Sequence, residues 1–177
     1  MDRHVPGEIG VLVNNVGISI PNKSTLESDP ADIESIIKTN VFSYVMMTKH
    51  FLQEAKTYRS KDQSFIIYLS SVVADIRNPN RNGFYQATKL QNKVFANYLY
   101  YPSSFRVDRL VLKPGWVSTP LTHNRKVDGF TASLEQETSA IMKCIGFTRE
   151  TYGQYKHLGM MLILGSVPEP VFHYSMK

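Results

Sequence analysis

Cysteine is almost absent from this chain, which carries one, Cys144, among its 177 residues. A single thiol excludes an internal disulfide and a zinc site built from several cysteines, and it suits a reducing compartment. The 5 histidines show no spacing typical of metal ligands. The sequence therefore predicts no metal site.

Long apolar runs are absent as well. No segment reaches the roughly 18 apolar residues that a membrane-spanning helix needs, and the most apolar late segment, Leu158 to Val167, is interrupted by glycine. The first six residues lack the apolar core of a signal peptide. On these grounds alone we expect a soluble, unprocessed, cytoplasmic chain.

The chain has no dense run of basic residues, although Lys and Arg total 20 against 15 Asp and Glu, for a net charge of +5. Basic residues that are spread along a chain favour a solvated surface over nucleic-acid binding. A basic face could still assist binding of an anionic cofactor or substrate.

Short apolar runs alternate with stretches of helical periodicity, within a length that fits a single domain over residues 1–177. Apolar runs without polar alternation predict buried strands at 9–15, 65–69 and 107–112. The spacing of apolar residues, with Asp29-Pro30 as a start signal and Pro102 as a stop, predicts helices from Pro30 to about Tyr58, around 85–99 and over 131–147. We expect a last short strand at 154–157, then a helical or irregular tail.

This alternation predicts an α/β fold, in which helices flank a parallel sheet with right-handed crossovers. Ligands bind such sheets at the carboxyl ends of the strands. Polar motifs follow each of the three strands, at Asn14-Asn15, Ser70-Ser71 and Pro114-Gly115. The sequence therefore predicts a site where these motifs meet.

Tyr85 and Lys89 are four residues apart on an expected helix, so their side chains share one face. A nearby ammonium favours the phenolate and would lower the pKa of the tyrosine. A serine hydroxyl close by could hydrogen-bond a carbonyl oxygen. Together these groups could give a proton to a ketone or take one from an alcohol, although the spacing alone is common on helix surfaces.

Four motifs stand in a fixed order along the chain: Asn14-Asn15-Val16-Gly17, Asn40 within Thr39-Asn40-Val41, Ser71 ahead of Tyr85-x-x-x-Lys89, and Pro114-Gly115-Trp116-Val117-Ser118-Thr119. In this order they resemble the motifs of the short-chain dehydrogenase/reductase family. The resemblance covers nearly the whole chain and implies a Rossmann-like sheet and a nicotinamide cofactor, NADP or NAD.

The resemblance implies catalytic roles for four residues. Tyr85 would be the general acid in ketone reduction, Lys89 would lower its pKa and hold the nicotinamide ribose, and Ser71 would orient the substrate carbonyl. Asn40 would help to hold a proton-relay water. The competing interpretation of Asn40 is a plain helix asparagine, but an unpaired amide is expensive to bury, which favours a polar role.

The resemblance also implies a cofactor site that includes Tyr85 and Lys89. Further members would come from the turn after the first strand and from the segment that lines the nicotinamide: Asn14, Gly17, Pro114, Gly115, Val117 and Thr119. Asn14 could instead be purely structural and bond strand backbone. Ser70 is expected to bond backbone rather than substrate.

The glycine-rich turn Gly-x-x-x-Gly-x-Gly, which takes the cofactor pyrophosphate at a helix N-terminus, does not occur in this sequence. By resemblance the chain begins where the second half of the Rossmann sheet begins, so we expect a fold truncated at its N-terminus. A truncated sheet would expose one strand edge and apolar faces unless a partner covers them. We therefore expect weak dinucleotide binding, or none.

Within the family, the segment from Glu8 to Ser19, the Tyr85 motif and the Gly-x-Tyr-x-His pattern from Gly153 to His157 are similar to the branch of very-long-chain 3-oxoacyl-CoA reductases and 17β-hydroxysteroid dehydrogenases. That likeness implies reduction of a 3-oxoacyl-CoA or keto-steroid with NADPH at the endoplasmic reticulum, and a possible homodimer. The alternative is a truncated, inactive dehydrogenase-like subunit or interaction module.

Overall fold

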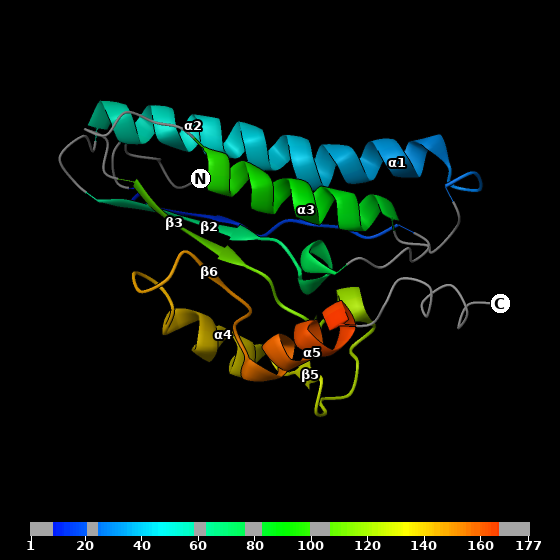
Figure 1. Cartoon of the computed structure of the whole chain (residues 1–177). Coiled ribbons are helices and arrows are strands. Elements are labelled where there is room, and N and C mark those ends of the chain that lie inside the picture. The colour runs from blue at the N-terminus through cyan, green and yellow to red at the C-terminus, as the bar shows by residue number, and fades with distance from the viewer. Residues whose placement is uncertain (1–8, 21–24, 59–62, 77–82, 100–106, 167–177) are drawn as a thin grey trace.

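The computed structural model describes residues 9–20, 25–58, 63–76, 83–99 and 107–166. In this part of the chain a four-stranded parallel sheet, of order β1-β2-β3-β6, lies between two layers of helices (Figure 1). The predicted α/β, Rossmann-like parallel sheet is confirmed.

The sheet strands are β1 (Val11–Asn14), β2 (Ser64–Leu69), β3 (Val107–Leu112) and β6 (Glu150–Thr151). A second, two-stranded parallel sheet pairs β4 (Trp116–Val117) with β5 (Thr131–Ala132). The helices are α1 (Pro30–Ile37), α2 (Ser43–Tyr58), α3 (Gly83–Tyr98), α4 (Leu134–Met142) and α5 (Tyr155–Ser166), and the short turns are η1 (Lys38–Phe42), η2 (Val72–Asp75) and η3 (Pro120–Thr122).

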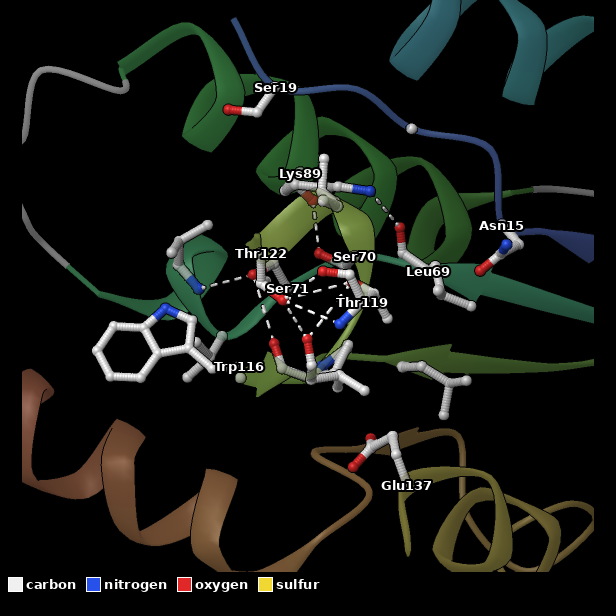
Figure 2. Close-up of a pocket in the computed structure, with 18 of the residues that line it drawn as sticks. Asn15, Ser19, Leu69, Ser70, Ser71, Lys89, Trp116, Thr119, Thr122 and Glu137 are labelled. Carbon is white, nitrogen blue, oxygen red and sulfur yellow. Dashed lines mark hydrogen bonds between the residues drawn. The ribbon is translucent and has the colours of Figure 1, made fainter. Parts of the chain in front are cut away.

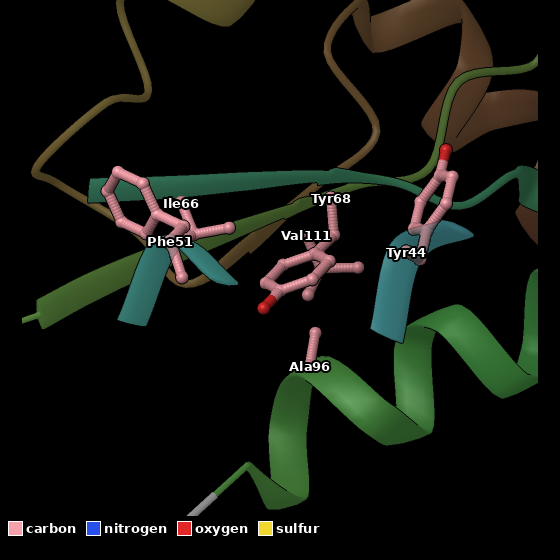
Figure 3. Packing of buried hydrophobic residues seen from close by; sticks show 6 residues of the cluster. All are labelled: Tyr44, Phe51, Ile66, Tyr68, Ala96 and Val111. Carbon is pink, nitrogen blue, oxygen red and sulfur yellow. The ribbon is translucent and has the colours of Figure 1, made fainter. Parts of the chain in front are cut away.

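One face of the sheet is covered by α1, α2 and α3 (Figure 1). Figure 3 shows its core, which joins two side chains of α2, two of β2, one of α3 and one of β3: Tyr44, Phe51, Ile66, Tyr68, Ala96 and Val111. Each of these residues is at least nine-tenths buried. This packing fixes the helix that carries Tyr85 and Lys89 against the end of β2.

The other face of the sheet packs on α4 and α5 (Figure 1). Ile67, Leu110 and Leu112 form its core, and side chains of α4 and the turn after it, among them Ile141, lie against them. Met160 of α5 packs with Val72 and Ile76 around η2. The two cores together hold the carboxyl ends of β2 and β3 in place.

The long helix expected from Pro30 to Tyr58 is present, and Asp29 caps it through a hydrogen bond from Ala31 N. It is divided by η1, a π-helical segment over Lys38–Phe42. Such segments interrupt the α-helical hydrogen-bond pattern and recur at functional sites.

Three expected boundaries near the C-terminus were wrong. The helix expected over 131–147 ends early, at Met142. The helix expected from Thr131 begins at Leu134, because Ser133 and Gln136 form a capping box and the two residues before it pair with β4. The strand expected at 154–157 is helical, since α5 begins at Tyr155. Gly153, with a φ of 71°, turns the chain out of β6 into that helix.

No helix in the described ranges is both long and apolar enough to cross a membrane. The expected helix stop at Pro102, the loop residues 77–82 and the tail after Ser166 lie outside the described residues.

Candidate functional site

A pocket of about 960 Å³ opens at the carboxyl ends of β1, β2 and β3, between α3 on one side and α4 and α5 on the other. Eight of the residues expected at the site line it: Gly17, Ser71, Tyr85, Lys89, Pro114, Gly115, Val117 and Thr119. The residues come from four separate segments, so the fold brings together what the sequence keeps far apart.

Ser71 and Tyr85 meet in this pocket. Ser71 follows β2, caps η2 by accepting from Val73 N, and donates to the carbonyl oxygen of Pro114 at 3.4 Å. Tyr85 lies in the first turn of α3, where burial raises the pKa of its phenol and a hydrogen bond with Ser71 acts in the opposite direction. The phenol is therefore protonated at neutral pH, as a proton donor must be.

Lys89 is buried one turn further along α3. Its Nζ donates to the carbonyl oxygen of Leu69 at 3.0 Å, as Figure 2 shows, and lies 5.6 Å from the centroid of the Tyr85 ring. Burial lowers the pKa of Lys89 to about 8. The pKa of Tyr85 is thus raised and not lowered as expected, because the effect of burial outweighs that of the hydrogen bond with Ser71.

Ser70 fixes α3 to the sheet. Its hydroxyl donates to the backbone carbonyl of Lys89 at 2.6 Å, which is the backbone role expected for it. The helix position that carries Lys89 is therefore tied to the end of β2 by both the side chain and the main chain of the lysine.

Asn40 is fully buried in η1 and does not line the pocket. Its amide accepts from Ile18 N at 2.8 Å and donates to Ile18 O at 2.9 Å, and it also donates to Thr88 at 3.1 Å. It therefore connects the loop after β1 to α3. These bonds give the buried amide of Asn40 polar partners within the fold, and its expected part in holding a proton-relay water stays a prediction.

Asn14 lies away from the pocket, on the opposite side of β1. Its amide donates to Thr48 of α2 at 3.0 Å, and Thr48 in turn contacts the Tyr68 hydroxyl at 3.1 Å. The structural role is the one its contacts support, whereas Asn15, the next residue, lines the pocket.

Gly17 is the point where backbone approaches the buried lysine. A Cβ at this position would lie 3.1 Å from Lys89 Nζ and 3.5 Å from Asn40 Oδ1. The missing side chain leaves room beside the ammonium.

Sequence reasoning missed several residues of the site. Gln86 donates to the carbonyl oxygens of Val73 and Ile76 and so holds η2 against α3. Apolar side chains from η2 and the residue after it, from α4 and from α5 also line the pocket: Val72, Val73, Ile76, Leu134, Ile141, Met160 and Leu164. Gln86 could have been suspected from its position beside Tyr85. The contribution of α5 could not, because the sequence predicted a strand over 154–157, where this helix begins.

A buried ionic cluster behind η2 was also missed. Lys113 Nζ lies 2.9 Å from Asp75 Oδ2 and 2.6 Å from Glu150 Oε2, and Lys93 of α3 bonds the other oxygen of Asp75. Tyr152 donates its hydroxyl to Asp75 at 2.7 Å. The cluster joins η2, α3, β3 and β6, and so it fixes the segment that follows Ser71.

These contacts define what the pocket can do. A buried, protonated phenol and a serine hydroxyl converge in a mainly apolar pocket, beside an ammonium whose pKa is near 8. Such an arrangement can bind a carbonyl oxygen through two hydroxyl groups and transfer one proton to it.

Comparisons with known proteins find relatives of this chain. The profile of the short chain dehydrogenase family matches residues 1–130. The 17-beta-hydroxysteroid dehydrogenase type 3 of Rattus norvegicus is 31% identical over 173 residues, which cover 95% of this chain and 54% of that protein. Its namesake in Danio rerio is 33% identical over 167 residues, which cover 91% of this chain and 53% of that protein. The chain thus spans about half the length of these relatives.

Solved structures share the fold. A short chain dehydrogenase from Burkholderia cenocepacia in complex with NADP has a TM-score of 0.74 at 18% identity, covering 97% of this chain and 70% of that one. A 3-ketoacyl-(acyl-carrier-protein) reductase from Brucella melitensis complexed with NADH has a TM-score of 0.70 at 19% identity, covering 85% of this chain and 68% of that one.

Proposed function

Because the chain belongs to the short-chain dehydrogenase family, we propose that its pocket interconverts a ketone and an alcohol with a nicotinamide dinucleotide. The observation that carries this proposal is the convergence of Ser71, Tyr85 and Lys89 on one pocket with Pro114 and Gly115. The residues fit the nicotinamide end of such a cofactor, because Gly17 leaves space beside the Lys89 ammonium.

In reduction, the bound nicotinamide supplies the hydride. Ser71 and Tyr85 hydrogen-bond the substrate carbonyl oxygen, and the Tyr85 hydroxyl gives it the proton. Lys89 holds a positive charge near the phenolate that results, which favours the transfer. Asn40 fixes the loop after β1 and the Thr88 turn of α3, and so keeps Tyr85 and Lys89 in place.

We propose a 3-oxoacyl-CoA or a keto-steroid as the substrate. Support comes from the relatives named 17-beta-hydroxysteroid dehydrogenase type 3 and from the apolar lining supplied by η2, α4 and α5. NADPH is the cofactor proposed, and location at the endoplasmic reticulum is a proposal from the same likeness.

Replacement of Tyr85 by Phe tests the proposed reaction. The variant keeps the ring and loses the proton donor, so the rate of ketone reduction with NADPH should fall by about 100-fold or more. Tyr98→Phe, at the exposed far end of the same helix, is the matched control and should leave the rate unchanged. Equal rates for wild type and Tyr85→Phe would contradict the role of Tyr85.

A second candidate, an inactive subunit or interaction module, is favoured by β1. In the described part of the chain this strand pairs on one side only, and Val11 and Val13 are 54% and 52% exposed. An apolar edge strand invites a partner. A titration of the 177-residue chain with NADPH separates the candidates: weak or no binding would favour the module, whereas a dissociation constant in the low-micromolar range would contradict it.

We also propose that a second copy of the chain packs on the helical layer of α1–α3. Its outer side exposes a set of apolar side chains on η1, α2 and α3: Phe42, Met46, Met47, Leu90 and Val94. Apolar groups gathered on neighbouring helices favour association with a like surface.

A further inference from the structure

His157 of α5 is fully buried, and each of its ring nitrogens faces a backbone carbonyl oxygen, which can only accept a hydrogen bond. Nε2 lies 3.0 Å from the carbonyl oxygen of Trp116, whereas Nδ1 lies 3.3 Å from that of Tyr152 and 3.2 Å from Oε2 of Glu137. A neutral imidazole carries one proton and would set a lone pair against one of these oxygens. An imidazolium donates at both nitrogens, so the contacts select the charged ring.

Two glycines make room for this pair. A Cβ on Gly115 would lie 2.8 Å from Cδ2 of His157, and a Cβ on Gly153 would lie 2.0 Å from Oε1 of Glu137. Any side chain at either position would displace the pair. The buried ring and carboxylate are therefore fitted directly against the backbone of the pocket wall.

The backbone that His157 holds belongs to the pocket. Gly115 and Trp116 line it, next to Pro114, whose carbonyl oxygen accepts from Ser71. Glu137 lines the pocket from α4, on the side away from Lys89 in Figure 2. We propose that His157, as an imidazolium paired with Glu137, is a positioning residue that fixes the backbone from Gly115 to Val117. Its effect on turnover rests on the proposed function, whereas its charge and its hold on this segment do not.

The charged and polar groups around the ring explain how it stays protonated. Within the described residues, Glu137 of α4 is the titratable side chain that acts on His157. Trp116 of β4 and Tyr152, which follows β6, contribute only their backbone carbonyl oxygens to the ring. Burial alone would lower the pKa of His157, but the hydrogen bond and negative charge of Glu137, with the two carbonyls, raise it.

The sign of the pH dependence follows from this direction. The folded pKa of His157 lies above the unfolded value of about 6.5, so the pair contributes stability below that pH. The contribution is lost as the pH rises through the folded pKa. The segment should therefore loosen on the alkaline side.

The test uses the complete 177-residue chain with nitrogen-15-labelled histidine and glycine and with tryptophan labelled in the indole. Nuclear magnetic resonance should show both ring nitrogens of His157 protonated at pH 7. The amide of Gly115 and the indole of Trp116 should then shift at the same alkaline midpoint as the ring. Trp116 is the single tryptophan of the chain, so its assignment needs no further variant.

Glu137→Gln keeps the shape of the pair and removes its charge. The midpoints of His157, Gly115 and Trp116 should move together to lower pH. His123→Asn, which replaces an exposed histidine in the loop after η3, should leave all three midpoints unchanged. A neutral His157 ring at pH 7, with the proton on Glu137 instead, would overturn the proposal. So would Gly115 and Trp116 signals that do not follow the ring.

An activity measurement extends the test without replacing it. In a chain that reduces a ketone, kcat/KM should fall over the alkaline range in which His157 loses its proton, and Glu137→Gln should move that fall to lower pH. Absence of any ketone reduction would count against the proposed function alone, because the resonance measurements need neither cofactor nor substrate.

Discussion

Two buried polar side chains at the pocket, those of Lys89 and Asn40, are hydrogen-bonded to backbone groups. Lys89 has the carbonyl oxygen of Leu69, and Asn40 has both backbone groups of Ile18. Each such group loses its hydration on folding and keeps only the partners that the fold provides. The site is therefore built at a cost in stability that individual substitutions can reveal.

Lys89→Met should stabilise the chain at pH 7 by about 2 kcal/mol. The folded pKa of Lys89, about 8, lies below the usual value of 10.5 because burial penalises the charge. That difference corresponds to roughly 3 kcal/mol, of which the lost bond to Leu69 offsets about 1. Urea unfolding of both proteins gives the comparison.

The gain from Lys89→Met should shrink as the pH rises from about 8 to about 10.4, because the folded lysine of the wild type loses its proton there before the unfolded one does. Lys38→Met, which removes an exposed ammonium of the helical layer, is the control and should show no such trend. A gain that stays constant with pH would contradict the buried charge.

At the scale of elements, η2 depends on the ionic cluster behind it. Burial alone would lower the pKa of Lys113, but hydrogen bonds and charge from Glu150 and Asp75 raise it. The pKa of Asp75 is lowered, because its bonds to Lys93, Lys113 and Tyr152 outweigh its burial. The ammonium at the end of β3 is thus the link between the segment after Ser71 and β6.

Lys113→Met should destabilise the chain by about 2 kcal/mol, because it leaves the part-buried carboxylate of Glu150 without its ion-pair partner and that of Asp75 with Lys93 alone. The measurement is urea unfolding at neutral pH. Lys38→Met breaks an exposed pair with Glu34 on α1 and should cost less than about 0.5 kcal/mol. The difference between wild type and Lys113→Met should shrink as the pH falls below about 4, where the carboxylates of the unfolded chain protonate. Equal costs for the two lysines would show that the cluster carries no stability.

The sequence predicts those elements whose signals are local. Asp29 and Pro30 mark the start of a helix, and the apolar runs mark β1 and β3 as strands. The burial expected of β1 was wrong, because Val11 and Val13 are more than half exposed on this edge strand. The helical conformation of residues 155–157 could not be predicted. It depends on the positive φ of Gly153 and on the close approach of Glu137 to that glycine. The direction of the Tyr85 pKa was equally hidden, since it is set by burial.

Eight of the ten residues expected from the four motifs line the pocket, because most of these motifs lie at a strand end or on one helix face. What the motifs could not supply was the ionic cluster, whose members Asp75, Lys113 and Glu150 are joined only when three strands are side by side. Contacts between distant segments follow from topology, and no spacing in the sequence records them.

At the scale of the whole molecule, the outer side of the helical layer leads to a prediction about assembly. Introducing Leu90→Glu together with Val94→Glu places two charges on the exposed stripe of α3, so the wild-type dimer should become a monomer in analytical ultracentrifugation. Leu162→Glu, on exposed α5 at the other face of the sheet, should leave the dimer intact. A wild type that sediments as a monomer at every concentration would contradict the proposed dimer.

The π-helical segment η1 sets the rotational phase of everything after it. Buried residues recur at every fourth position through Ile36, Asn40, Tyr44 and Thr48. In an α-helix of 3.6 residues per turn, each such step would drift by roughly 40° around the axis. The wider turn at Lys38–Phe42 absorbs part of that drift, so Ile36 and Tyr44 can both point toward the protein interior. Deleting one residue there would restore a regular helix in which Ile36 and Tyr44 are separated by roughly two full turns, so the buried stripe of α2 should keep facing the sheet.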